Sequence, residues 1–208
     1  MLDFYEFVYG INWILSKSDP KEKDTTMIKL KEIVMSCKKC RLADNRNNVV
    51  FGEGNFYARL MFIGEGPGAE EDAQGRPFVG RAGQLLDKMI LAMGLKREEV
   101  YIANIVKCRP PNNRAPFRDE AELCKPYLIE QIKFIKPELI ICLGSIATNY
   151  LLNEDVSITK VRGSIRDFNG IKVIPTYHPA YLLRNANKKA EAWEDLKKAM
   201  AILNLIEK

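Results

Sequence analysis

Short apolar runs alternate along the chain with segments in which apolar residues recur every three or four positions. Continuous apolar runs at 60–63 and 139–143, and the stretch 100–106, which is apolar except for Asn104, have the length of strands, and each predicts a buried strand. A fourth strand is expected at 171–177, as the second arm of a hairpin whose first arm is 161–166. An Asn-Gly pair between the two arms is a strong hairpin signal. Helical spacing predicts helices between and after the strands, at about 85–93, 119–135, 145–152 and 188–205. This alternation predicts a mostly parallel sheet with helices on both faces.

The N-terminal part of the chain is predicted to be a helical extension of one larger domain. Apolar residues at helical spacing predict an amphipathic helix over 1–18, followed by a polar break. Thr25 or Thr26 is expected to cap a second helix that runs to the first cysteines. We therefore expect an extension at 1–24 and a single α/β domain at 25–208.

The composition does not indicate a membrane protein or a secreted protein. No apolar run approaches the length of a membrane span. Asp3 and Glu6 stand where a signal peptide needs positive charge, so a cytoplasmic protein is expected. The formal net charge of +5 suits a polyanionic partner but does not require one.

Polar residues follow the ends of the predicted strands. Right-handed crossovers place the carboxyl ends of parallel strands along one edge of the sheet, where α/β proteins bind ligands. Glu65, Asn104, Ser145 and His178 each lie just beyond or near the end of a different strand. The Gly-Glu-Gly-Pro-Gly loop at 64–68 would let backbone N–H groups approach a ligand closely. It has neither the lysine of a P-loop nor the spacing of a dinucleotide-binding loop.

Each of these candidate residues also has a purely structural interpretation. His178 is the only histidine, and a lone histidine is often structural, but at a strand end it can stabilise a developing negative charge. Glu65 can be read as a solvated turn carboxylate. Phe78 can be read as a core residue, although its loop setting favours a stacking partner. For Asn104, structural hydrogen bonding and ligand recognition both fit a buried amide at a strand end.

Four of the five cysteines are candidates for a metal centre. Cys142 lies within the apolar run 139–143 and is expected to be a core residue. The remaining four are a Cys-x-x-Cys pair and two single residues, all flanked by basic side chains. One pair with two single residues favours an iron–sulfur cluster over zinc, while disulfides remain the competing explanation. The four candidates are Cys37, Cys40, Cys108 and Cys124.

Several separated motifs, in the right order, resemble the family 4 uracil-DNA glycosylases, the iron–sulfur members of their superfamily in thermophilic bacteria and archaea. The matching segments are GEGPGAEEDAQGRPFVGRAGQLLD, NIVKCRPP, LGSIA and HPAYLLR, together with the four cysteines. The resemblance implies a three-layer α/β/α sandwich around a four-stranded, mainly parallel sheet, with a [4Fe-4S] cluster on the four cysteines. It also implies hydrolysis of the N-glycosidic bond to uracil in DNA, which starts base excision repair, and flipping of uracil out of the duplex.

The resemblance also implies roles for individual residues. Phe78 would stack on the flipped uracil, Asn104 would read its O4 and N3 edge, and His178 would stabilise its O2 as the base leaves. Glu65 and Gly66 would line the same pocket, although the family often has alanine at the position of Gly66. Glu65 is the expected carboxylate for activating water, and the alternatives are Glu71 and Asp72. Four residues are expected to contact DNA: Ser145, Tyr181, Leu182 and Arg184.

Uracil-containing DNA, single- or double-stranded, is the expected partner. A sliding clamp is a further candidate partner, and a monomer is expected. No lysine stands out as a Schiff-base nucleophile, so strand cleavage is not expected. Crosslinking relatives carry an inserted, histidine-bearing segment, whereas here 79–83 runs directly into the predicted helix. The alternative function is a noncatalytic iron–sulfur module that binds nucleic acid within a replication or repair protein.

Overall fold

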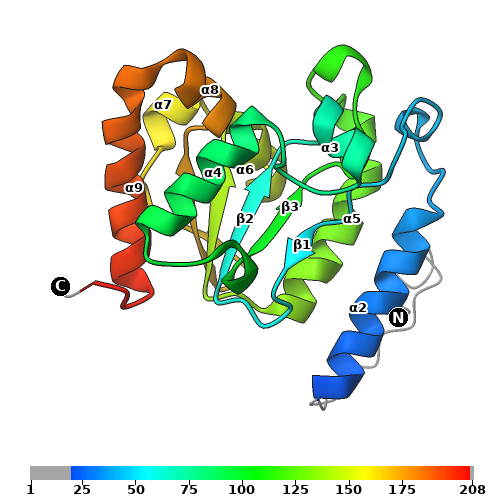
Figure 1. Cartoon of the computed structure of the whole chain (residues 1–208), viewed down its shortest axis with the longest axis horizontal. Helices are drawn as coiled ribbons and strands as arrows, with labels where there is room; N and C mark the ends of the chain where they lie inside the picture. The colour runs from blue at the N-terminus through cyan, green and yellow to red at the C-terminus, as the bar shows by residue number, and fades with distance from the viewer. Residues whose placement is uncertain (1–19, 207–208) are drawn as a thin grey trace.

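The computed structural model describes residues 20–206, which form a three-layer arrangement with one sheet in the middle (Figure 1). Within these residues the sheet has six strands in the order β1-β3-β2-β4-β6-β5. The four central strands are parallel, and the two edge strands run antiparallel to their neighbours. The strands are β1 (Glu53–Gly54), β2 (Leu60–Gly64), β3 (Tyr101–Asn104), β4 (Leu139–Leu143), β5 (Arg166–Phe168) and β6 (Ile171–Thr176).

Helices cover both faces of this sheet. Consecutive strand residues point to opposite faces, so the strands divide the core into two halves. In β2, Met61 and Ile63 belong to the half that packs with α2, α5 and α6, whereas Leu60 and Phe62 belong to the half that packs with α4, α8 and α9. Within residues 20–206, no helix combines the length and apolar character needed to cross a membrane. The α-helices are α2 (Pro20–Met35), α3 (Ala69–Gln74), α4 (Arg81–Ala92), α5 (Arg118–Ile135), α6 (Ser145–Leu152), α7 (Ile158–Val161), α8 (Pro179–Arg184) and α9 (Lys189–Ile202).

The central part of the predicted fold is confirmed. The strand predicted at 139–143 and the helix predicted at 145–152 have those bounds in the structure. All five residues of β2 are buried, as expected for a parallel strand covered on both faces. The α/β class, the three layers and the parallel centre of the sheet therefore follow from apolar patterning alone.

The sheet is wider than the four strands that were predicted. Strand β1 pairs with β3 at the edge of the sheet, in a segment where no strand was predicted. It has only two residues, too few for a periodic pattern. Gly54 lies so close to β3 that a Cβ there would overlap the carbonyl oxygen of Val100. Strand β1 therefore depends on the close approach of its backbone to that of β3, and not on burial of apolar side chains.

The hairpin is confirmed at its turn but is wrong in its first arm. Asn169 and Gly170 both have positive φ, of 52° and 84°, as a two-residue type I′ turn requires. The first arm, predicted at 161–166, begins only at Arg166, because Val161 ends helix α7. Between them the backbone turns at Gly163, which has a φ of 67° and leaves no room for a side chain against Asp195.

Helix α2 begins earlier than the predicted capping residues. Pro20 is its first residue, a position at which the missing N–H of proline costs nothing. Thr25 and Thr26 lie inside the helix, so their predicted capping role is wrong, and α2 runs across the expected boundary at residue 24. The helix predicted at 1–18 lies outside the described residues.

Candidate functional site

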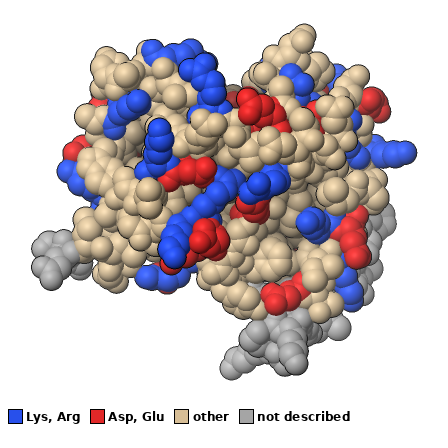
Figure 2. All heavy atoms as spheres, viewed as in Figure 1, with Lys and Arg blue, Asp and Glu red and all other residues tan. Residues whose placement is uncertain are grey.

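A cavity of about 440 Å³ opens at the carboxyl ends of the parallel strands. Figure 2 shows a notch at the top of the view, with Lys and Arg side chains gathered on its left-hand wall. Three of the four residues that were expected to converge at this edge line the cavity: Glu65 after β2, Asn104 at the end of β3 and His178 after β6. Ser145, the first residue of α6, is not among the lining residues. The predicted residues Gly66, Phe78, Tyr181 and Arg184 also line the cavity.

Close packing around Gly64 brings two of these side chains together. Gly64 pairs with Asn104 in the parallel register of β2 and β3. A Cβ on Gly64 would overlap both the Asn104 amide and the Phe78 ring, so only glycine lets both side chains approach this strand end. The Phe78 ring lies 5.6 Å from the His178 ring, centroid to centroid, with an interplanar angle of 33°. Phe78, Asn104 and His178 therefore line the cavity together, and Gly64 lies beneath the amide and the phenyl ring.

The Asn104 side chain carries an unused hydrogen-bond acceptor. The residue is only 1% exposed, and its Oδ1 has no partner among the described residues. A buried polar atom without a partner costs on the order of 1–3 kcal/mol, so such atoms are rare unless a ligand satisfies them. The structure thus favours ligand recognition over a purely structural amide at this position.

Hydrogen bonding defines the protonation state of His178. The residue caps α8, and its Nδ1 accepts a hydrogen bond from the Ala180 N–H at 3.1 Å. A neutral ring that accepts at Nδ1 carries its proton on Nε2. The ring lines the cavity and is partly buried, and this loss of hydration, helped by the charge of Arg184, lowers the pKa of His178 to about 4. At neutral pH, His178 is therefore an uncharged hydrogen-bond donor.

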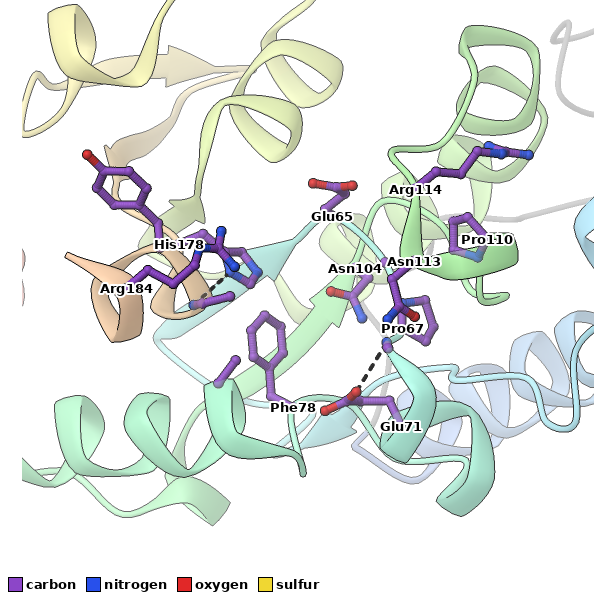
Figure 3. Close-up of a pocket in the computed structure, with 15 residues that line it drawn as sticks. Glu65, Pro67, Glu71, Phe78, Asn104, Pro110, Asn113, Arg114, His178 and Arg184 are labelled. Atoms are coloured by element: carbon purple, nitrogen blue, oxygen red, sulfur yellow. Dashed lines mark hydrogen bonds between the residues drawn. The ribbon is translucent and has the colours of Figure 1, made fainter.

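Glu65 lies between His178 and Asn104 at the end of β2 (Figure 3). Its surroundings remove much of its hydration, and this desolvation raises the pKa of its carboxyl group above the ordinary value of 4.5. The carboxylate is partly exposed and lines the cavity, so it can act on a bound molecule or on water.

The two alternative carboxylates are held by backbone and amide groups. Glu71 lines the cavity but accepts hydrogen bonds from the N–H groups of Gly68, Val79 and Gly80, at 3.1, 2.9 and 2.8 Å. Asp72 is 1% exposed and accepts hydrogen bonds from the Asn47 backbone and side chain. Asp72 as a candidate for water activation is therefore wrong, and Glu71 joins the glycine-rich loop to the Phe78 loop.

Helix α8 carries three of the residues that were predicted to contact DNA, and they do not share one environment. Tyr181 and Arg184 line the cavity, and the Tyr181 ring stacks on Tyr177 at 5.1 Å between centroids. Leu182 is only 1% exposed and packs in the core with α4 and α9, so its predicted DNA contact is wrong. Its neighbour Leu183 is the exposed leucine of the pair, at 39%.

Sequence reasoning missed one side of the cavity. Three of its lining residues come from the loop around the 3-10 helix η3 (Pro111–Asn113), for which no role in the site was predicted. Arg114 in this loop is held by Glu120 through two bonds of 2.7 and 2.8 Å and lies 3.8 Å over the Phe117 ring. The three lining residues are Pro110, Asn113 and Arg114.

The four candidate cysteines line a second, smaller cavity next to α2 and α5. They are free thiols, and Cys108 and Cys124 are buried. Each of these two thiols already accepts a hydrogen bond: Cys108 from Arg46 Nη1 at 3.1 Å, and Cys124 from the Lys107 N–H at 3.3 Å. Burial raises the pKa of Cys124 to about 12. As predicted, Cys142 is a fully buried core residue in β4.

The thiols surround a shared space, and their contacts suit a negatively charged group. Among the described residues, no three Cys, His, Asp or Glu side chains are arranged to hold a single metal ion. The cavity is also lined by the cationic side chains of Lys39, Arg46 and Lys107. N–H donors and cations around thiolate sulfur stabilise its negative charge, so this donor set fits a thiolate-bound cluster.

Comparison with known proteins places this fold and cavity in a family. The model of the Uracil DNA glycosylase superfamily matches residues 51–197. A type-4 uracil-DNA glycosylase of Thermotoga maritima is 51% identical over 176 residues, which cover 83% of this chain and 92% of the relative. Those of Sulfurisphaera tokodaii and Saccharolobus solfataricus are 50% and 48% identical, over 82% of this chain and 81% and 83% of the relatives. The chain therefore belongs to the type-4 branch of the uracil-DNA glycosylase superfamily.

Proposed function

We propose that this protein is a monofunctional glycosylase that removes uracil from DNA by hydrolysis and leaves an abasic site for base excision repair. The observation that carries the proposal is the unpaired Oδ1 of Asn104 at the floor of the cavity, beside Phe78 and His178. A nucleobase can enter such a cavity only after it has left the duplex stack, so the base must be flipped. Tyr181 and Arg184 at the cavity wall would contact the DNA around it.

Asn104 would select uracil through the direction of its hydrogen bonds. Uracil presents an N–H donor at N3 and an oxygen acceptor at O4, which match the Oδ1 and the NH₂ group of one amide. Cytosine presents an acceptor at N3 and a donor at N4, so the same amide would face two mismatched groups. Phe78 would stack on the base and hold its edge against Asn104.

His178 and Glu65 would stabilise opposite charges as the glycosidic bond breaks. The electron pair of the C1′–N1 bond moves to the base, and negative charge grows on uracil O2. The Nε2–H of neutral His178 would donate a hydrogen bond to that oxygen. The sugar becomes cationic, and the Glu65 carboxylate would stabilise it and orient the water that attacks C1′. The water oxygen bonds to C1′, its proton passes to the Glu65 carboxylate, and uracil leaves as the anion that carries the electron pair of the broken C1′–N1 bond.

Hydrolysis, and not lyase chemistry, is supported by the residues of the cavity. A lyase needs an amine that forms a Schiff base with the sugar. No lysine is among the described residues that line the cavity. The buried Lys107 ammonium is held by the Asn104 carbonyl at 3.0 Å and by Gln131 at 2.7 Å.

Cys37, Cys40, Cys108 and Cys124 would hold a [4Fe-4S] cluster. The support is their common cavity and the donors around their sulfur atoms. When bound, such a cluster would tie together the segment after α2, the loop after β3 and helix α5, which contribute its ligands. Its role would be structural, because these cysteines do not line the cavity that would hold the base.

A uracil-containing oligonucleotide tests the reaction. The wild-type protein should leave an abasic site that breaks on alkali treatment, with an intact strand before alkali. His178→Ala should lower kcat by about 100-fold or more, because one donor to a developing oxyanion is worth roughly 10²–10³ in rate. Binding of the same DNA should change little.

Lys172→Ala, an exposed position at the start of β6, is the control. Full activity of His178→Ala would exclude the donor role, and an inactive wild type would favour a noncatalytic module.

Asn104→Asp tests base selection. A carboxylate has two acceptors and no donor, so it should repel uracil O4 and accept from the N4 group of cytosine. The ratio of uracil to cytosine release should fall by about tenfold or more, since an unsatisfied polar contact costs on the order of 1–3 kcal/mol. Asn104→Ala should lose uracil release without gaining cytosine release. An unchanged ratio in Asn104→Asp would contradict recognition by this amide.

The pH dependence of the rate distinguishes Glu65 from His178. If Glu65 must be ionised, the single-turnover rate should fall as the pH drops through its raised pKa, above 4.5. His178 becomes protonated only near its pKa of about 4. Glu65→Gln should therefore have a lower rate at neutral pH, and its rate should not fall as the pH drops towards 4.5. Circular dichroism over the same pH range controls for unfolding. Persistence of the decline in Glu65→Gln would assign it to another group.

Metal analysis tests the cluster. The purified protein should be brown, with broad visible absorption and about four iron atoms per chain. Substitution of any of the four ligands by serine should lower the iron content. Cys142→Ala is the matched control, because this fifth cysteine is buried in β4 and should leave the iron content unchanged. A colourless protein with one zinc ion would contradict the cluster.

A further inference from the structure

The backbone of Phe78 is held in a conformation that side-chain-bearing residues rarely adopt. Its φ is 50°, in the left-handed region that favours glycine. A residue stays in this region only where the surrounding contacts outweigh its preference for another conformation, and such residues cluster at functional sites. Phe78 is also the residue proposed to stack on the base, so the contacts that hold its backbone also orient its ring.

Two side chains hold this backbone from opposite sides. On the N–H side, Glu71 Oε1 accepts from the Val79 and Gly80 amides. On the carbonyl side, Arg97 donates to the Pro77 oxygen from Nη2 at 2.5 Å and to the Phe78 oxygen from Nη1 at 3.2 Å. The two contacts together fix the peptide groups on both sides of the Phe78 Cα.

Two glycines also pack directly against Phe78. A Cβ on Gly83 in α4 would overlap the Phe78 carbonyl group, so the start of this helix packs directly against the Phe78 backbone. Gly64 contacts the Phe78 ring in the same way from the end of β2. The side chain and the main chain of Phe78 are therefore both confined before any base is present.

Arg97 itself is firmly anchored away from the cavity. It lies in the 3-10 helix η2 (Arg97–Glu99), and its side chain is 19% exposed. Its Nη1 pairs with Asp87 of α4 at 2.6 Å, and its Nε lies 3.5 Å from Glu53 of β1. Arg97 is not among the residues that line the cavity. Any influence on a bound base must therefore pass through the loop that it holds.

We propose that Arg97 is a positioning residue for base recognition, which holds the Phe78 ring in its stacking orientation through the Pro77 and Phe78 carbonyl groups. The inference rests on the proposed stacking role of Phe78. The planar guanidinium presents several N–H groups in a fixed fork, and it can bind two neighbouring carbonyls and a carboxylate at once. A lysine has one ammonium group and would keep the charge without this geometry.

A double-mutant cycle tests whether Arg97 acts through Phe78. The four proteins are the wild type, Arg97→Met, Phe78→Ala and the double variant, each measured for single-turnover uracil release. Arg97→Met should lower the rate by about tenfold or more, because displacement of a positioned group by about 1 Å can cost on the order of 100-fold. In the Phe78→Ala background the same change should lower the rate by less than about twofold, because coupled residues are not additive. Affinity for uracil-free DNA should stay unchanged.

The controls separate positioning from general stability. Arg59→Met is the matched variant, since Arg59 also binds a carboxylate, Glu138, at 2.6 and 2.9 Å and donates to a carbonyl, that of Leu203, at 2.9 Å. Arg59 precedes β2, at the end of that strand opposite to the cavity, and Arg59→Met should keep the wild-type rate. If Arg97→Met does not fold, Arg97→Lys carries the same cycle, with thermal unfolding followed in parallel.

The outcomes distinguish the two proposals. An equal effect of the Arg97 substitution in both backgrounds would overturn its action through Phe78. A large effect of Phe78→Ala with no effect of Arg97→Met would overturn the role of Arg97 and leave the stacking role intact. An unchanged rate in Phe78→Ala would overturn the stacking role on which the inference rests.

Discussion

The absence of a side chain at Gly64 is the constraint on which the cavity depends. Gly64 pairs with Asn104 across two parallel strands, and a Cβ there would displace both the amide and the Phe78 ring. The strand pairing continues past this point, since the N–H of Ile105 donates to the Gly64 carbonyl at 2.9 Å and that of Val106 to the Glu65 carbonyl at 3.1 Å. The register of one strand pair therefore sets the positions of the Asn104 amide and the Glu65 carboxylate, and Gly64 leaves room beside them for the Phe78 ring.

The same strand end connects the cavity to the cysteine site. Four residues after Asn104 the chain reaches Cys108, and between them the Lys107 N–H donates to Cys124 Sγ. The Lys107 side chain turns back and donates to the Asn104 carbonyl and to Gln131 Oε1 of α5. A cluster bound to these cysteines would therefore brace the backbone that carries Asn104, although none of its ligands lines the cavity.

Apolar patterning predicted the strands and helices that have long, regular apolar patterns. It did not predict the elements whose position depends on backbone contacts. β4 and α6 were predicted to the residue, and the strand ends placed Glu65, Asn104 and His178 correctly at one edge. Strand β1 has two residues and helix α8 has six, so neither is long enough to show a periodic apolar pattern. For this reason the sequence predicted neither strand β1 nor the burial of Leu182. Asn113 and Arg114 belong to no periodic pattern. The residues themselves suggested stacking by Phe78 and charge stabilisation by His178, and the family resemblance identified uracil as the partner of both.

Burial adjusts the two titratable groups of the cavity in complementary ways. The same loss of hydration lowers the pKa of His178, so it is a neutral donor, and raises the pKa of the Glu65 carboxyl group. The hydrogen bond from a neutral imidazole to uracil O2 would strengthen as negative charge grows on O2 of the departing base, so it would stabilise the transition state more than the bound, neutral base. A base that fills the cavity displaces more water and strengthens both interactions. A flipped base in the cavity would thus strengthen the interactions of His178 and Glu65 that stabilise the charges formed when the base leaves.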